Sequence, residues 1–295
     1  MKFNNENQVK SYMKKESSNL GITVPRIYST YFSRELLKRI SLFNFGEIVV
    51  KGSFSQYVHL QRLIRPVTDV DLASKLCFGD AMIPLINSIN AYDDEINFVI
   101  NKEPYRKPST GMYKITVEAH LGNIVQPIGI DFHEHIKSLY ETQYKPVVPI
   151  FKNDDIFYTN TPSFEEHLAE KLCIVCESNK PDVINTRLKD FYDIYEMHGG
   201  KYDPDKFSLY FARMLNDRGK IDTDTASTAH LSKEFVNSHQ DTWDAMREKY
   251  EFLDKDIEFC EAVYYTRAVL SEQLQKMKTK TVYYGPSLSL KKEYK

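Results

Sequence analysis

The pattern of apolar residues changes near residue 150, and this change constrains the fold more than any other feature of the sequence. Before it, short runs rich in β-branched residues are separated by turn residues, which is typical of strands. The predicted strands are residues 47–51, 70–73, 96–100, 113–121 and 127–133, and the predicted helices are residues 30–42, 55–63 and 80–90. The first part of the chain therefore predicts an α+β domain with a mixed sheet.

The rest of the chain predicts helices. One begins at Ser163, a typical N-cap residue, and runs to about residue 178. Further helices are predicted at residues 184–198, from residue 204 onward, and twice between residues 232 and 276. We therefore expect two domains, residues 1–150 and 151–295, the second of which is helical.

The composition favours an intracellular protein but indicates no particular partner. The chain has 295 residues, of which 41 are acidic and 39 are basic, although an enzyme that is nearly neutral overall can still bind nucleic acid through a local basic patch. The polar N-terminus lacks the apolar stretch of a secretory signal, and no run is long enough to span a membrane. Cys173 and Cys176 form a C-x-x-C without a second pair, so we expect reduced thiols in a cytoplasmic protein.

A glycine and a serine join the strand at residues 47–51 to the helix that follows it. At Gly52 the backbone can approach a ligand closely, and Ser53 adds a hydroxyl at the start of the helix. Backbone N–H groups at a helix N-terminus bind phosphate readily. The pattern predicts a phosphate-binding turn, although a Gly-Ser pair alone is common in loops.

Asp69 and Asp71 lie two residues apart in a predicted strand. Side chains at this spacing point to the same face, so the two carboxylates project together while Val70 points into the core. Hard oxygen ligands of this kind suit Mg²⁺, which leaves coordination positions open for substrate phosphates. The alternative is a pair of exposed aspartates on an edge strand.

Asp131 lies in an otherwise apolar strand, Ile128-Gly129-Ile130-Asp131-Phe132. A carboxylate in such a strand is costly without a partner. We predict that Asp131 is a third metal ligand, from a strand beside that of Asp69 and Asp71. The alternative is a strand-end aspartate that faces solvent.

Lys171 lies at the edge of the apolar stripe of the helix that begins at Ser163, while Glu166, Glu170 and Glu177 are expected to point into water. Lysine is seldom buried without a reason. Its ammonium would hold a triphosphate or act as a proton donor or acceptor. The alternative is a lysine whose stem packs on the apolar stripe and whose ammonium reaches solvent.

The next helix carries two charged pairs. Arg187 and Asp190, three residues apart, share one flank and are predicted to form an ion pair. Lys189 and Asp193, four apart, are expected on the outer side as a surface pair that supports the helix.

Taken in order, these motifs resemble a known family. Lys51-Gly52-Ser53, followed by Thr68-Asp69-Val70-Asp71, resembles the first two motifs of the DNA polymerase β-like nucleotidyltransferase superfamily. Glu170-Lys171-Leu172, followed by Arg187-x-Lys189-Asp190-x-x-Asp193, resembles the third and fourth motifs of the AbiEii/AbiGii toxin family of abortive-infection and toxin–antitoxin systems. The four motifs occur in family order within residues 47–198.

The resemblance implies a polymerase β-like nucleotidyltransferase domain and a helical domain that closes the active-site cleft. It assigns phosphate contacts to the first motif and Mg²⁺ to the two aspartates of the second. It also places Lys171 in the third motif and the Arg187–Asp193 set in the fourth. Members of the family are bacterial toxins that use nucleoside triphosphates, and some add nucleotides to tRNA 3′ ends. The usual partner is a winged-helix antitoxin, often one that does not bind the toxin, as in type IV systems.

Two positions depart from the family pattern. The third motif usually continues to an alanine and an arginine, where this chain has Ile174 and Ser178. The first motif often has Gly-Gly where this chain has Gly52-Ser53. The missing arginine would weaken nucleotide binding or shift that contact to another cation.

We predict a Mg²⁺-dependent nucleotidyltransferase toxin that transfers a nucleotide from a nucleoside triphosphate to RNA, with tRNA as the expected acceptor. The predicted catalytic residues are Asp69, Asp71, Asp131, Lys171 and Asp190, of which the first three bind the metal. The predicted nucleotide-binding residues are Gly52, Ser53, Lys171, Arg187, Lys189 and Asp193. Two alternatives remain: a nucleotidyltransferase that modifies a small molecule or a protein, and a member that binds nucleotide or nucleic acid without catalysis.

Overall fold

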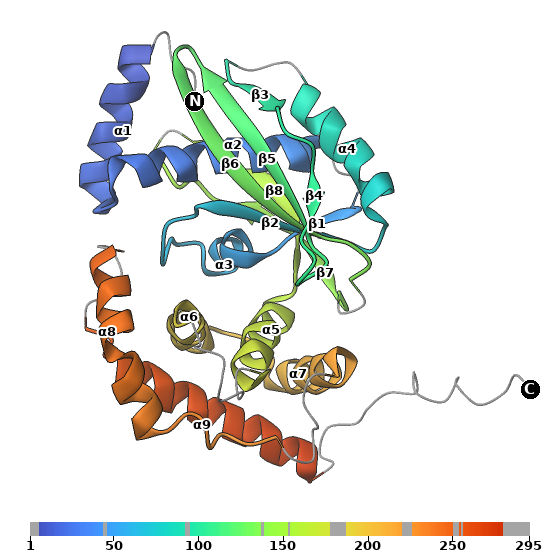
Figure 1. Ribbon diagram of the computed structural model, residues 1–295, viewed down its shortest axis with the longest axis vertical. Coiled ribbons are helices and arrows are strands. Elements are labelled where there is room, and N and C mark those ends of the chain that lie inside the picture. Colours follow the sequence, from blue (N-terminus) through green and yellow to red (C-terminus); the bar gives the residue numbers. More distant parts are fainter. Residues whose placement is uncertain are drawn as a thin grey trace, which may run out of the picture. The chain divides into compact units, whose positions relative to one another are not determined.

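The chain divides into two compact units. The computed structural model describes residues 6–43, 46–91, 95–136, 139–152, 154–177, 187–219, 226–249, 254 and 256–279. Unit 1 comprises Met1–Ser163 and Arg247–Leu253, and unit 2 comprises Phe164–Met246 and Asp254–Lys295 (Figure 1). Within the described residues, no helix is both long and apolar enough to cross a membrane.

Unit 1 is built on a six-stranded mixed sheet with the order β1-β2-β6-β5-β3, and β4 pairs with β5. The strands are β1 (Ile48–Val50), β2 (Asp69–Ser74), β3 (Asn97–Ile100), β4 (Tyr105–Arg106), β5 (Tyr113–Leu121) and β6 (Ile124–His133). The β2–β6 pair is parallel and the other pairs are antiparallel. The predicted α+β fold with a mixed sheet is therefore confirmed.

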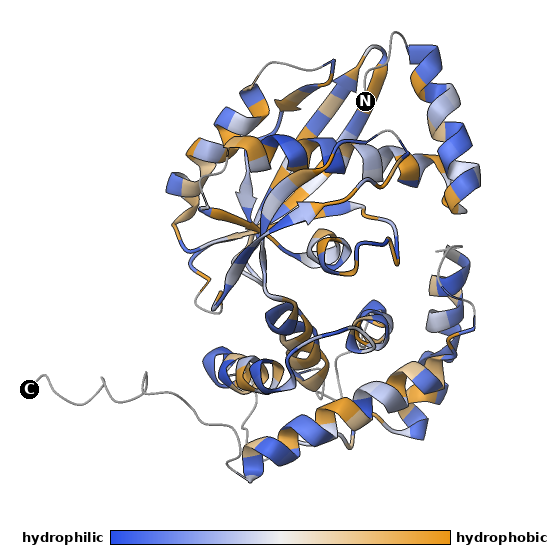
Figure 2. Ribbon diagram, turned by 180° about the vertical axis from the view of Figure 1, so that it is seen from behind, coloured by the Kyte–Doolittle hydropathy of each residue, from blue (hydrophilic) through white to orange (hydrophobic). Residues whose placement is uncertain are grey.

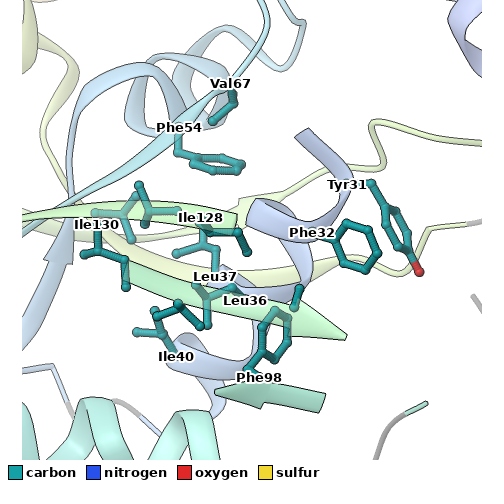
Figure 3. Packing of buried hydrophobic residues seen from close by; sticks show 14 of the residues in the cluster. Tyr31, Phe32, Leu36, Leu37, Ile40, Phe54, Val67, Phe98, Ile128 and Ile130 are labelled. Carbon is teal, nitrogen blue, oxygen red and sulfur yellow. The ribbon is translucent and has the colours of Figure 1, made fainter. Parts of the chain in front are cut away.

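One face of this sheet carries the core. Alternate residues of β5 and β6 are buried, among them Val117, Ile128 and Ile130, and the residues between them are partly exposed. In Figure 2 the two strands accordingly alternate between hydrophobic and hydrophilic residues. Helices α2 (Val24–Phe43) and α4 (Phe78–Asn90) contribute buried side chains to the same core cluster. Figure 3 shows the α2 residues beside the strand residues of this core.

Helix α1 (Glu6–Leu20) and the two-stranded sheet of β7 (Thr142–Val147) and β8 (Phe157–Pro162) were not predicted. In α1 the buried apolar residues are only Val9 and Met13, too few to give a clear helical stripe. The small sheet contains Pro146, Asn160 and Pro162, and these residue types are depleted in strands, which weakens its strand pattern. Helix α3 (Gly52–Leu60) packs beside it, and the hydroxyls of Ser55 and Thr161 lie 2.6 Å apart.

A buried arginine ties α2 to the segment before β8. Nε of Arg34 lies 3.1 Å from Oδ2 of Asp154, and both side chains are fully buried. Arg34 also pairs with Glu35 at 2.9 Å, donates to the carbonyl oxygen of Asp155 and lies over the ring of Phe157. The guanidinium thus satisfies groups that would otherwise be buried without a partner.

Replacing Arg34 with methionine is expected to lower the free energy of unfolding by about 3–5 kcal/mol, because a buried acidic group loses its counter-ion. Urea unfolding monitored by circular dichroism measures this change. The matched control is Lys38→Met, which removes the more exposed pair with Asp155 (side chains 24% and 63% exposed) and should cost less than about 1 kcal/mol. Equal losses in the two variants would contradict this role of Arg34.

His59 gives unit 1 a predictable pH dependence. Its Nε2 lies 2.8 Å from the carbonyl oxygen of Pro162, so that nitrogen must carry the proton. Burial, aided by the charge of Lys145, lowers the pKa of His59 from 6.5 to about 4, although the bond to Pro162 opposes the shift. Between these values the unfolded chain binds the proton and the folded chain does not, so stability falls as the pH falls.

We expect the free energy of unfolding to drop by about 2–3 kcal/mol between pH 6.5 and pH 4 through His59 alone. Urea unfolding at a series of pH values, compared between the unmodified protein and His59→Gln, isolates this contribution because the other titrating groups are shared. Parallel pH profiles for the two proteins would rule the assignment out.

Unit 2 contains α5 (Phe164–Glu177), α6 (Lys189–His198), α7 (Pro204–Arg218) and α9 (Phe259–Lys278), and α8 (Lys233–Lys249) begins in it. The predicted helix starts after Ser163 and at residue 204 are confirmed. Helix α6 is shorter than predicted, because Arg187 and Leu188 precede it, and residues 184–186 and Ser178 lie outside the described residues.

The expectation that Glu166 points into water is wrong, because its side chain is buried. Glu170 is half-buried, and Glu177 forms an ion pair with Arg218. The physical reason is the position of α5 within unit 2. It packs against α6, α7 and α9, so the face opposite its apolar stripe is also covered.

Candidate active site

The predicted alternation around the acidic pair is present in β2. Val70 is fully buried, whereas Asp69 and Asp71 on either side of it are partly exposed. Both carboxylates therefore lie on the face of the sheet opposite the core, as the two-residue spacing predicts. Strand β2 pairs with β6 from Asp69 to Ala73 and with β1 from Leu72 to Ser74.

The first motif lies directly against Asp71. The backbone N–H of Lys51 donates to the carbonyl oxygen of Asp71 at 2.8 Å, which joins the end of β1 to β2. The chain then turns into α3 at Gly52, whose φ is +59°. A Cβ atom at Gly52 would lie 1.7 Å from Oδ2 of Asp71. Only glycine allows both this backbone conformation and this approach of the carboxylate.

The N-terminus of α3 has features of an anion-binding site. Lys51 occupies the N-cap position but makes no side-chain capping hydrogen bond, which leaves the N–H groups of the first turn for another acceptor. Among the described residues, the buried hydroxyl of Ser53 and the buried amide of Gln56 have no hydrogen-bond partner. Buried polar groups normally have partners, so these two fit a site that receives a polar ligand.

Gln56 was not predicted as a site residue. The sequence shows it simply as a member of the helix after Gly52-Ser53, and an amide side chain on a helix is more often exposed. Its three-residue separation from Ser53, which places both on one flank of α3, is the signal that would have indicated it.

Asp131 lies beside the acidic pair and is held by a lysine. The parallel register of β2 and β6 pairs Asp71 with Asp131, and the antiparallel register of β5 and β6 pairs Asp131 with Lys114. Nζ of Lys114 lies 2.8 Å from Oδ1 of Asp131. This hydrogen bond raises the pKa of Lys114, and the charges of Asp131, Tyr105 and Asp69 act in the same direction.

The structure therefore brings Asp69, Asp71 and Asp131 onto neighbouring positions of one sheet face, with Lys114 as a counter-ion that the sequence interpretation missed. The donor set consists of carboxylate oxygens, which are the ligands Mg²⁺ prefers. Within the described ranges, no group of three or more His, Cys, Asp or Glu side chains is close enough together to hold a metal ion.

A second charged cluster lies within unit 2. Nζ of Lys171 on α5 lies 2.6 Å from Oδ2 of Asp193 and 3.4 Å from Oδ1 of Asp190, both on α6. All three side chains are at most 7% exposed. Arg187 reaches Asp190 with a 2.7 Å ion pair, which confirms the predicted pair. The cluster contains two acidic and two basic side chains and so carries no net charge, which lowers the free-energy cost of burying it.

The prediction that Asp193 lies on the outer side of its helix is wrong. Asp193 is fully buried and bonded to Lys171, while Lys189 is partly exposed. Spacing within one helix could not show this, because the partner of Asp193 comes from α5. The structure thus brings together Lys171 of the third motif with Arg187, Asp190 and Asp193 of the fourth.

A mixed sheet with paired carboxylates beside an uncapped helix N-terminus, followed by a helical unit, is the arrangement of a nucleotidyltransferase. The family model described as "Nucleotidyl transferase AbiEii toxin, Type IV TA system" matches residues 35–264. The chain therefore belongs to the AbiEii family of nucleotidyltransferase toxins, and this membership implies an antitoxin partner.

The solved structures that this chain matches share little sequence with it. JHP933 from Helicobacter pylori is 14% identical, with a TM-score of 0.49, and the match covers 87% of this chain and 94% of that one. An antigenic nucleotidyltransferase-like protein from Paracoccidioides brasiliensis is 13% identical, with a TM-score of 0.37, over 66% and 88% of the two chains. No curated protein sequence matches this chain.

Proposed function

We propose that this protein is a Mg²⁺-dependent toxin that transfers a nucleotide from a nucleoside triphosphate to an RNA acceptor, with tRNA as the acceptor class. The observation that carries the proposal is the contact between Asp71 and Gly52. It sets a metal-binding carboxylate against the start of α3, where backbone N–H groups suit phosphate. Metal and triphosphate would thus meet at one point.

In the proposed reaction, a hydroxyl oxygen of the acceptor attacks the α-phosphorus of the nucleoside triphosphate. The new P–O bond forms as the bond to the β-phosphate oxygen breaks, and pyrophosphate leaves. Asp131 accepts the proton of the hydroxyl. Asp69 and Asp71, with Asp131 as a third ligand, would hold the Mg²⁺, which when bound would neutralise phosphate charge and lower the pKa of the attacking hydroxyl.

The remaining motif residues are assigned to the triphosphate. The first-turn N–H groups of α3 and the Ser53 hydroxyl bind its phosphates, and the Gln56 amide adds a further hydrogen bond. Lys171 is assigned to nucleotide binding through the third motif, and within unit 2 Asp190 and Asp193 hold its ammonium in place. Arg187 and Lys189 contribute to nucleotide binding through the fourth motif. We further propose that the antitoxin is of the winged-helix type.

The test is to incubate the purified protein with Mg²⁺, each labelled nucleoside triphosphate in turn and total bacterial tRNA, beside Asp69→Ala and a reaction with EDTA. Label on tRNA that requires both Asp69 and the metal supports the proposal. Label on a protein or a small molecule instead would replace RNA as the acceptor. Absence of labelling and of nucleotide binding would favour a non-catalytic protein.

A further inference from the structure

The sheet face that carries the carboxylates extends beyond them toward β4. Register alone aligns four side chains across four strands, Asp71 on β2, Asp131 on β6, Lys114 on β5 and Tyr105 on β4. The ion pair between Lys114 and Asp131 shows that the side chains of these two residues, in the middle of the row, lie on the same face of the sheet. Neighbouring strands are about 4.8 Å apart, so Tyr105 lies roughly 10 Å from Asp131, which is the scale of one nucleotide.

The neighbouring row on the same face is open. It consists of Asp69 on β2, Gly129 on β6 and Thr116 on β5. A Cβ atom added at Gly129 would meet no atom within 4 Å. A strand glycine often marks a place where a ligand or another backbone approaches closely. The sheet therefore leaves room beside Asp69 for the end of an acceptor molecule.

The side chain of Tyr105 is exposed to solvent on this face of the sheet. It is 57% exposed, although β4 pairs in register with β5. An exposed tyrosine offers a flat surface on which a nucleic-acid base stacks, whatever the base. Its position in the row of Asp131 places such a base roughly 10 Å from the residue proposed to accept the proton of the acceptor, with Lys114 between them.

The hairpin that carries Tyr105 is basic, unlike the chain as a whole. Residues 102–114 contain four basic side chains and one acidic side chain, whereas the whole chain has slightly more acidic than basic residues. The basic residues are Lys102, Arg106, Lys107 and Lys114. Lys102 is exposed and Lys107 is partly exposed. Arg106 follows Tyr105 in β4 and so projects from the other face, where it lies over the ring of Tyr113 and 3.5 Å from Glu134. Such a concentration of positive charge suits a phosphate backbone.

We propose that Tyr105, Thr116, Gly129 and the basic hairpin of residues 102–114 form the binding surface for the 3′ end of a single-stranded RNA acceptor. The terminal base stacks on Tyr105, and the lysines contact the phosphates that precede it. The open position at Gly129 admits the terminal ribose toward Asp131. This inference rests on the proposed nucleotidyl transfer and specifies its acceptor. A protein partner is less well suited, because the surface joins a single aromatic ring to clustered cations.

Binding of a short, mixed-sequence, fluorescently labelled RNA, measured by anisotropy without nucleotide, tests the surface directly. Tyr105→Ala should weaken binding about tenfold, while Tyr105→Phe, which keeps the ring, should not. The matched control is Tyr144→Ala, because Tyr144 is 65% exposed but lies on β7 in the other sheet. Lys102→Gln and Lys107→Gln should each reduce the slope of log K against log salt concentration by about 0.7.

The transfer reaction separates this inference from the proposed function. Tyr105→Ala should raise the KM for RNA about tenfold without lowering kcat, because the ring binds the acceptor and takes no part in the chemistry. Gly129→Leu should abolish labelling of RNA yet keep the thermal shift caused by nucleoside triphosphate and Mg²⁺. If Tyr105→Ala matches Tyr144→Ala in both assays while the unmodified protein labels RNA, this inference is wrong and the proposed function stands. If RNA binds through Tyr105 but no acceptor is ever labelled, the proposed function fails instead.

Discussion

Replacing Asp71 with asparagine is expected to lower the rate of nucleotide transfer by at least about 10²–10³-fold without unfolding the protein. Asparagine has nearly the same shape, so the approach to Gly52 is kept. What is lost is one negative charge opposite Asp131. A neutral amide binds Mg²⁺ more weakly than a carboxylate does, so the loss should be larger at low metal concentration.

Initial rates over a range of Mg²⁺ and Mn²⁺ concentrations, with circular dichroism and thermal unfolding, measure the effect. Without metal, Asp71→Asn should be at least as stable as the unmodified protein, since it relieves repulsion with Asp131. Asp241→Asn is the matched control, because Asp241 is an exposed aspartate on α8 in unit 2. Full activity of Asp71→Asn would remove Asp71 from the proposed site.

The sequence was sufficient to predict those parts of the fold that depend on local pattern. The strand of Asp69 and Asp71, its buried Val70 and the turn at Gly122-Asn123 all follow from alternation and turn chemistry. Strand β6 begins at Ile124, earlier than the predicted residue 127, because it pairs with β5 immediately after this turn.

The Lys114–Asp131 pair could also have been predicted from the sequence. Leu121 pairs with Ile124 across the turn, and counting seven further positions outward on each strand brings Lys114 opposite Asp131. The pairing of Asp71 with Asp131 could not be obtained in this way. These strands are parallel and distant in sequence, so no turn sets their register.

The periodicity of apolar residues predicted side-chain burial wrongly in helices that are covered on more than one side. Glu166 and Asp193 were placed in water because each lies away from the apolar stripe of its own helix. Both are buried, since α5 and α6 pack against each other and against further helices of unit 2. A periodicity shows which side of a helix is most apolar, but the number of neighbours decides how many sides are buried.

Replacing Gly52 with alanine is expected to reduce nucleotide transfer by about 10²-fold or more and to lower stability by about 1–2 kcal/mol. A Cβ atom at Gly52 would lie 1.7 Å from Oδ2 of Asp71, so the carboxylate must move away. The positive φ of +59° adds backbone strain that is independent of this contact. Activity and stability therefore fall for different reasons.

Gly21→Ala separates the two causes. Gly21 has a similar φ of +63°, but a Cβ atom there would meet nothing within 4 Å. Both variants should lose similar stability in urea unfolding, because both force alanine into the left-handed region. Only Gly52→Ala should lose transfer activity and show weaker binding of Mn²⁺ by calorimetry. Equal transfer activity in the two variants would mean that the contact between Gly52 and Asp71 does not position the metal-binding carboxylate.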